Sequence, residues 1–227
     1  MSEIIELPVK LDVPPKIGVV VVDLGSREHL LLCLQSLFLV LKDLEVEICL
    51  VILNGNKEYD EMYDRQGVHV IHAHDSGWSQ GCNQALKTFS SNVSVLLFLS
   101  SDLIFLDSES WEALFKESVA EKLSYGFDSS LTVMGTQAFY FFSDGFLLTP
   151  KTCFEKCGGW DERVFSTGSI LNMGRILEQH GLTLEKLPDG MINRYQMNKD
   201  SIFSDVRHAI EFENDFPSIS KTLNNDD

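Results

Sequence analysis

The chain has 227 residues, of which 44% are apolar, and its 34 acidic and 18 basic side chains give a formal net charge of −16 and a pI near 4.7. This length and apolar fraction fit one α/β domain with a sizeable core, or at most two small domains, and argue against bulk disorder. The negative charge repels phosphate backbones and anionic membranes, which argues against nucleic acid as a partner. It does not exclude a small charged ligand in a single cleft.

The N-terminal residues 1–16 lack the basic start and apolar run of a signal peptide, and no stretch reaches the roughly 18 apolar residues of a membrane helix. We therefore expect a cytoplasmic protein without a transmembrane segment. The odd number of cysteines and their apolar surroundings indicate reduced thiols that pack as small apolar side chains. These are Cys33, Cys49, Cys82, Cys153 and Cys157.

The first half of the chain alternates strand and helix patterns. Runs of β-branched or continuously apolar residues predict strands within 16–26, 45–56, 68–72 and 94–100. Helical spacing of apolar residues, or a short acidic stretch between turns, predicts helices within 27–44, 58–67 and 76–90. This alternation predicts an α/β fold with a Rossmann-like, mainly parallel sheet covered by helices on both faces.

The second half of the chain continues with mixed patterns. Residues 107–123 predict a helix with an acidic first turn, and 131–142 and 144–149 are strand-like. A helix is expected to start at Thr149-Pro150, with the threonine as its cap, and to stop at Gly158-Gly159. A further helix is expected to start within 166–169 and to end at Gly181. We expect the whole of 1–227 to form a single domain.

Ligands of parallel sheets bind outside the carboxyl ends of the strands. Three of these ends carry polar or small residues, at 23–25, 53–56 and 100–102. Asp102 is notable because it follows a long apolar strand, and the mouth of a buried strand is a costly place for a purely structural charge. Its alternative role is a turn cap that accepts from backbone amides.

Several motifs, in order, resemble the family 2 glycosyltransferases with the GT-A nucleotide-sugar fold, especially the rhamnosyltransferase-like members. The motifs are "VVVVDLGSREHLLLCLQSL", "VILNGN", "DSGWSQGCNQAL", "LLFLSSDLIF" and "FLLTPKTCFEKCGGWDERVF". The resemblance covers roughly residues 17–182. It implies a nucleotide-sugar-binding half over 17–106, an acceptor-side half over 107–200 and a tail region over 201–227.

The chain departs from the family pattern at three functional positions. Leu53 stands where the family has a base-binding aspartate, and Ser100 stands where it has the first aspartate of its metal-binding Asp-x-Asp motif. No carboxylate lies between Glu162 and Glu178, where the family carries its catalytic base. The resemblance therefore implies a degenerate site, with Asp102 as the remaining metal ligand.

Sugar transfer needs a positive centre to neutralise the departing diphosphate and a base to deprotonate the acceptor. Mn²⁺ or Mg²⁺ on Asp102 could supply the first, because such ions often rest on one or two carboxylates. A basic side chain could replace the ion; the candidates are Arg175, Arg194, Lys199, Arg207 and His208. Asp161 and Glu162 are the nearest candidates for the base, with Asp144 as another.

The resemblance also implies residues that contact a nucleotide sugar, and each has a structural alternative such as a turn, close helix packing or core filling. These residues are Asp23, Asn54, Asp75, Gly77, Gly81, Asn83, Ser100, Ser101 and Asp102 for the nucleotide sugar, and Trp160 for the acceptor.

Three functional hypotheses follow from these patterns. The first is a glycosyltransferase that uses a nucleotide-diphosphate sugar and an acceptor still to be identified. The second is a catalytically inactive GT-A protein that serves as a binding or scaffolding module, because three carboxylates with different tasks are missing. The third, a nucleotidyltransferase-like relative, ranks last because the loop after the first strand has no glycine-rich basic motif.

Overall fold

The computed structural model describes residues 14–23, 25–53, 67–73, 77–106, 109–126, 129–134, 137–142, 145–163, 173, 176–177 and 179–194. For 129–134 and 137–142 it describes the backbone only. The predicted short helix at 58–67 therefore lies outside the described residues, apart from its last residue. Helical residues at 173, 176, 177 and 179 agree with the helix predicted to end at Gly181, which has a φ of +68°.

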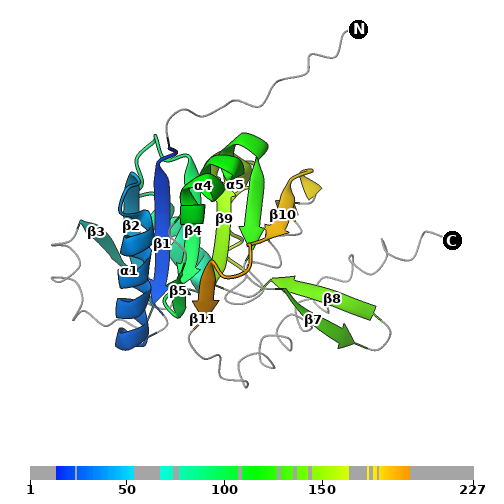
Figure 1. Ribbon diagram of the computed structural model, residues 1–227, viewed down its shortest axis with the longest axis horizontal. Helices are drawn as coiled ribbons and strands as arrows, with labels where there is room; N and C mark the ends of the chain where they lie inside the picture. Colours follow the sequence, from blue (N-terminus) through cyan, green and yellow to red (C-terminus); the bar gives the residue numbers. More distant parts are fainter. Residues whose placement is uncertain are drawn as a thin grey trace, which may run out of the picture.

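A seven-stranded sheet forms the centre of the molecule, in the order β10-β6-β9-β4-β1-β2-β3 (Figure 1). Its strands are β1 (Ile17–Asp23), β2 (Val46–Ile52), β3 (Val68–His72), β4 (Val95–Ser100), β6 (Leu123–Gly126), β9 (Phe146–Pro150) and β10 (Thr183–Lys186). β9 runs antiparallel to both of its neighbours, and the other pairs are parallel. The predicted α/β fold with a mainly parallel sheet is confirmed.

Two small sheets accompany the central one. β5 (Leu103–Phe105) pairs with β11 (Ile192–Arg194), and β7 (Ser129–Met134) pairs with β8 (Gln137–Phe142), both antiparallel. The β5–β11 pair brings a late segment of the chain beside the turn that follows β4. This pairing shapes the candidate site.

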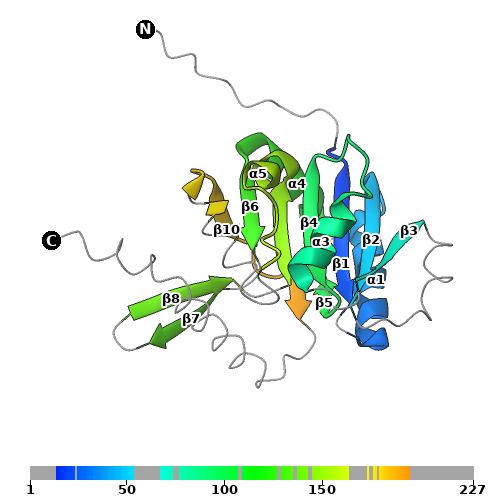
Figure 2. The same ribbon diagram turned by 180° about the vertical axis from the view of Figure 1, so that it is seen from behind.

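Helices cover both faces of the central sheet, as predicted. α1 (Arg27–Leu41) and α4 (Glu109–Glu121) pack in the core cluster that contains Val19 and Val21, and α1 lies in front of the sheet in Figure 1. α3 (Trp78–Leu86) and α5 (Lys151–Lys156) pack in the cluster that contains Val20 and Val22, and α3 is in front in Figure 2. Side chains of a strand alternate between its faces, so β1 contributes to both cores.

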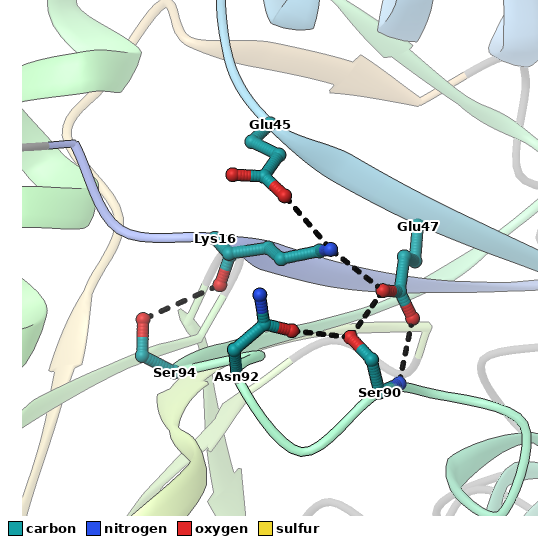
Figure 3. A network of polar contacts seen from close by, with 6 residues as sticks. All are labelled: Lys16, Glu45, Glu47, Ser90, Asn92 and Ser94. Atoms are coloured by element: carbon teal, nitrogen blue, oxygen red, sulfur yellow. Dashed lines mark hydrogen bonds and ion pairs between the residues drawn. The ribbon is translucent and has the colours of Figure 1, made fainter.

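A polar network lies at the amino-terminal end of the sheet, where β1 and β2 begin (Figure 3). Lys16, just before β1, forms ion pairs of 2.8 Å with Glu45 and 2.9 Å with Glu47. The Glu47 carboxylate also accepts hydrogen bonds from the backbone amide and the hydroxyl of Ser90. The network therefore links the starts of β1 and β2 to the loop that precedes β4.

The predicted cap of α5 is wrong. The helix begins at Lys151, its N-cap residue is Pro150 with a φ of −58° and a ψ of 135°, and no side chain caps it. Thr149 belongs to β9 instead, and its hydroxyl lies 2.8 Å from the Ser124 hydroxyl inside the sheet. Thr149 is fully buried, so the hydrogen bond to Ser124 satisfies a polar group that would otherwise be costly to bury.

Candidate functional site

The carboxyl ends of β1 and β4 bring polar side chains together. The two strands are adjacent and parallel, with Val22 opposite Ser100. The Ser101 amide donates to the Val22 carbonyl at 2.9 Å, and the Ser101 hydroxyl donates to Asp23 Oδ1 at 3.4 Å. Both side chains are buried. The structure thus places Asp23, Ser100, Ser101 and Asp102 at one edge of the sheet.

Asp23 is 2% exposed, yet one of its oxygens is unused by the described residues. Its Oδ1 accepts from the Gly25 amide at 2.9 Å, in a turn that Gly25 permits with a φ of +93°. Its Oδ2 is buried without a hydrogen-bond partner among the described residues. A buried oxygen in this state is costly, and a ligand that donates an N–H or O–H would remove the cost.

Asp102 forms a partly buried cluster with Ser100 and Arg194, named here the Arg194 cluster. Arg194 Nε lies 3.0 Å from Asp102 Oδ2, with side-chain exposures of 10% and 17%. The Ser100 hydroxyl donates to Asp102 Oδ1, and Arg194 Nη2 donates to the same hydroxyl at 3.5 Å. Both oxygens of Asp102 are therefore engaged by the protein itself.

Two features of the backbone hold the Arg194 cluster. The β5–β11 register places Arg194 opposite Leu103, directly after Asp102. Gly145, before β9, accepts from the Ser100 amide at 2.7 Å and has a φ of +90°. A Cβ atom at Gly145 would lie 2.8 Å from Arg194 Nη2 and would also clash with the Ser100 hydroxyl. Only glycine therefore leaves room for this arrangement.

Cys33 of α1 lies beneath this edge and is a structural group. Its Sγ donates to the Ser100 carbonyl at 3.8 Å. Burial, and secondarily the negative charge of Asp102, raise the pKa of the Cys33 thiol well above its ordinary value. A thiol held in its protonated form is a poor nucleophile. Cys33 therefore packs the site from below and does not supply chemistry.

Asn83 of α3 holds the loop that follows α5. Its Nδ2 donates to the Trp160 carbonyl at 2.9 Å and to Glu162 Oε1 at 3.1 Å, and its Oδ1 accepts from the Trp160 amide at 3.2 Å. The side chain that was expected to face a nucleotide is thus used in bracing the loop after α5.

Trp160 is 3% exposed, and its ring packs with Phe98 and Phe154 at centroid distances of 5.1 Å and 5.7 Å. The expectation that this ring stacks on an acceptor sugar does not agree with its burial. The alternative reading, in which the ring fills the core, agrees with the structure. Through these ring contacts, Trp160 attaches the loop after α5 to Phe98 of β4 and to Phe154 of α5.

The two carboxylates after Trp160 are in different states. Arg163 donates to Asp161 through its backbone amide and through two guanidinium nitrogens, at 3.1, 2.9 and 2.7 Å. These hydrogen bonds from Arg163 hold the pKa of the Asp161 carboxyl below its ordinary value. Asp161 is therefore a weak base. Glu162 is exposed, and its Oε1 accepts one hydrogen bond from Asn83.

The two glycines of the α3 motif have structural roles. Gly77 is the extended N-cap residue of α3. A Cβ atom at Gly81 would lie 2.7 Å from Val51 Cγ1, so this glycine allows close packing of α3 on β2. Leu53, at the position of the missing aspartate, packs against the same core.

Other candidates lie outside the described residues and stay predictions. They are Asn54, Asp75, Asp144, Arg175, Lys199, Arg207 and His208. In the part of the chain that is described, no three histidine, cysteine or acidic side chains are grouped as a metal site would require. Within the same ranges, no helix is long and apolar enough to cross a membrane.

The donor set around Asp102 does not fit a divalent cation. A metal ion would have to displace the guanidinium of Arg194 from Asp102 Oδ2, 3.0 Å away, and the Ser100 hydroxyl from Oδ1. The displaced Arg194 would remain as a second positive charge beside the ion, which is unfavourable at a partly buried position. The expectation of Asp102 as a lone metal ligand is therefore not supported by its surroundings.

Sequence reasoning named Arg194 only as one of five basic candidates and did not single out Gly145. Arg194 follows Ser100 by 94 residues, and their contact depends on the register of the three-residue strand β11. Such a short strand carries no readable alternation of apolar and polar residues. The Asp161–Arg163 pair, by contrast, could have been suggested by their closeness in sequence.

No protein-family model and no curated protein matches the chain. Its fold is nevertheless similar to solved glycosyltransferases. A mannosyltransferase from Pyrobaculum calidifontis, in complex with GDP-Man and Mn²⁺, has a TM-score of 0.66 and 11% identity over 87% of this chain and 61% of its own. GalNAc-T7 with UDP, GalNAc and Mn²⁺ has a TM-score of 0.65 and 14% identity over 83% and 45%.

The catalytic domain of Drosophila beta1,4galactosyltransferase 7, in complex with xylobiose, has a TM-score of 0.58 and 13% identity over 82% of this chain and 73% of its own. Like these three structures, the present chain has the GT-A fold. The chain spans less than two thirds of the length of the mannosyltransferase and of GalNAc-T7. At these identities the likeness concerns the fold, and the chemistry has to be argued from the residues.

Proposed function

We propose that this protein binds a nucleotide-diphosphate sugar at the carboxyl edge of β1 and β4 and transfers the sugar to an acceptor. The observation that carries the proposal is Asp23, a buried carboxylate with one oxygen available, beside Ser101 and the Arg194 cluster. Structures of similar fold contain GDP-Man, or UDP and GalNAc, which supports this ligand class. The order of the sequence motifs supports the proposal that the chain is a member of glycosyltransferase family 2.

Asp23 is proposed to recognise the nucleoside. Its Oδ2 can accept an N–H of the base or a ribose hydroxyl, while its Oδ1 stays bonded to the Gly25 amide and the Ser101 hydroxyl. Because Oδ1 is held by two donors, the carboxylate is fixed before the ligand arrives. A preorganised acceptor of this kind loses little entropy on binding.

The acceptor hydroxyl needs a base, and Glu162 is the better of the two predicted candidates. Both oxygens of Asp161 accept from Arg163, whereas Glu162 accepts a single hydrogen bond from Asn83. Asn83 also fixes the backbone of Trp160, so the loop that carries Glu162 is held against α3. We propose that Asp161 shapes this loop and that Glu162 accepts the proton.

The test is a thermal-shift screen with UDP, GDP, TDP and CDP and their sugars. A nucleotide at about 100 times its Kd should stabilise the native protein by about 2.7 kcal/mol. Asp23→Asn should weaken the binding about tenfold or more, because the amide that replaces Oδ2 donates where the ligand also donates. The control is Asp43→Asn on the exposed turn after α1, which should leave binding unchanged. No shift with any nucleotide would contradict the proposal.

A second candidate function is a non-catalytic binding module. The observation in its favour is that Arg163 neutralises Asp161 and Arg194 neutralises Asp102, which leaves few free carboxylates for chemistry. Sugar transfer or donor hydrolysis assayed with the nucleotide sugar from the screen separates the two functions. Turnover that falls about 100-fold in Glu162→Gln, with nucleotide affinity retained, supports the transferase. Tight binding without turnover supports the module.

A further inference from the structure

We propose that Arg194 is the built-in positive centre for the donor diphosphate, so that nucleotide binding does not depend on a divalent metal. The inference rests on the proposed function, and it concerns the same edge of the sheet. Its starting point is the mismatch between Asp102 and a metal ion. Asp102 is paired with a guanidinium at 3.0 Å, in the position expected to carry the metal ligand.

The guanidinium is held in one place by three separate segments. β11 delivers it beside β5, the Ser100 hydroxyl accepts from its Nη2 at 3.5 Å, and Gly145 leaves the space for it. With 10% of the side chain exposed, Arg194 is part of the edge and not a mobile surface arginine. An arginine fixed in this way has already lost the rotamer freedom that binding would otherwise remove.

The chemistry of arginine suits a diphosphate. A guanidinium carries five N–H donors in a planar fork, a geometry that matches the oxygens of a diphosphate. Its charge does not titrate in the physiological range, so it can stabilise the departing diphosphate without an ion. Asp102 then acts as a positioning residue that aims Arg194.

The location agrees with this role. Asp23, at the end of β1, has its free oxygen on the same edge as the Arg194 cluster, because Ser101 contacts Asp23 while Ser100 and Asp102 contact Arg194. One nucleotide could therefore place its nucleoside at Asp23 and its diphosphate at Arg194. The net charge of −16 makes a local cation at this edge more important for an anionic ligand.

The first experiment uses the native protein. Calorimetric titration with UDP, GDP, TDP and CDP, in excess EDTA and in Mn²⁺, should give affinities that agree within about threefold. Nucleotide binding that is lost in EDTA would overturn the inference and leave the proposed function intact. No binding in either buffer would overturn the proposed function. The metal titration below would still test whether Arg194 keeps a metal ion from Asp102.

The second experiment uses Arg194→Gln, which frees Asp102, and Arg194→Lys, which keeps the charge but not the planar fork. In EDTA, Arg194→Gln should bind the nucleotide at least about tenfold more weakly, and Arg194→Lys should be intermediate. Mn²⁺ should restore much of the binding to Arg194→Gln, because the freed carboxylate can then hold the ion. Lys116→Gln, which removes a cation from an ion pair on the exposed face of α4, is the matched control and should bind like the native protein.

A third readout needs no nucleotide. Titration with Mn²⁺ alone, followed by the electron paramagnetic resonance signal of the free ion, should show at least about tenfold tighter binding to Arg194→Gln than to the native protein. Equal Mn²⁺ affinities would overturn the inference. Asp102→Asn/Arg194→Gln removes the unpaired charge and keeps the experiment interpretable if Arg194→Gln does not fold; the double variant should lose metal-free nucleotide binding and gain no metal site.

Discussion

Gly145 is the residue whose replacement most directly probes the Arg194 cluster. Its φ of +90° disfavours any side chain, and a Cβ atom would press on Arg194 and Ser100. Gly145→Ala should therefore lower the free energy of unfolding by about 2–4 kcal/mol, from backbone strain plus overpacking. Denaturant unfolding followed by circular dichroism measures this change.

The matched control for this prediction is Gly190→Ala. Gly190 has a φ of +84°, close to that of Gly145, but a Cβ atom there would meet nothing within 4 Å. It should lose only the strain, about 1–2 kcal/mol. Equal losses for the two variants would show that the packing of Arg194 against Gly145 contributes nothing to stability.

At the scale of single residues, sequence reasoning was most successful where a position is fixed by its own strand. Asp23 and Asp102 follow long apolar runs, and both lie at the predicted edge of the sheet. It failed where a partner comes from elsewhere in the chain. The spacing of nearby residues predicts neither the ion pair between Asp102 and Arg194 nor the packing of Trp160 against Phe98 and Phe154.

At the scale of elements, the polar network before β1 predicts a dependence of stability on pH. Burial acts to raise the pKa of Glu47, but hydrogen bonds from Ser90 and Lys16 outweigh it and lower the pKa to about 2. The folded-state pKa lies below the ordinary value of about 4.3, so Glu47 stabilises the protein above that value. This contribution should be lost as the pH falls from about 4.5 to 2.

Glu47→Gln isolates this contribution. After allowance for solvent screening at a side chain that is 21% exposed, the variant should be less stable than the native protein by about 1–2 kcal/mol at pH 7. The difference should shrink toward zero near pH 2. Unfolding midpoints in urea measured between pH 2 and 7 check this, and a difference that is constant across the range would contradict the role of Glu47.

Long, periodic elements were predictable and short ones were not. β1, α1, α3 and β4 were expected from continuous apolar runs or helical spacing, and the structure has them over Ile17–Asp23, Arg27–Leu41, Trp78–Leu86 and Val95–Ser100. The strands β5, β6, β10 and β11 have three or four residues each and were not expected. They form because neighbouring strands offer free backbone groups, which is a property of the assembled sheet.

At the scale of the whole molecule, the parallel order of β4, β1, β2 and β3 explains why the polar residues meet. Every parallel strand of the central sheet ends at the same edge, and β9, the antiparallel strand described in that sheet, brings Gly145 to that edge from the other direction. The ion pairs of Lys16 with Glu45 and Glu47 lie at the opposite end, where β1 and β2 begin. One end of the sheet is thus fastened by ion pairs, and the other presents Asp23 and Arg194.

The central claim is that a nucleotide binds at this edge, and a crystal structure of the protein grown with the nucleotide diphosphate selected in the screen, in EDTA, tests it most directly. We predict the nucleoside within hydrogen-bonding distance of Asp23 Oδ2 and the diphosphate on the guanidinium of Arg194. A nucleotide bound elsewhere on the chain, or an edge that stays empty at saturating nucleotide, would contradict the account.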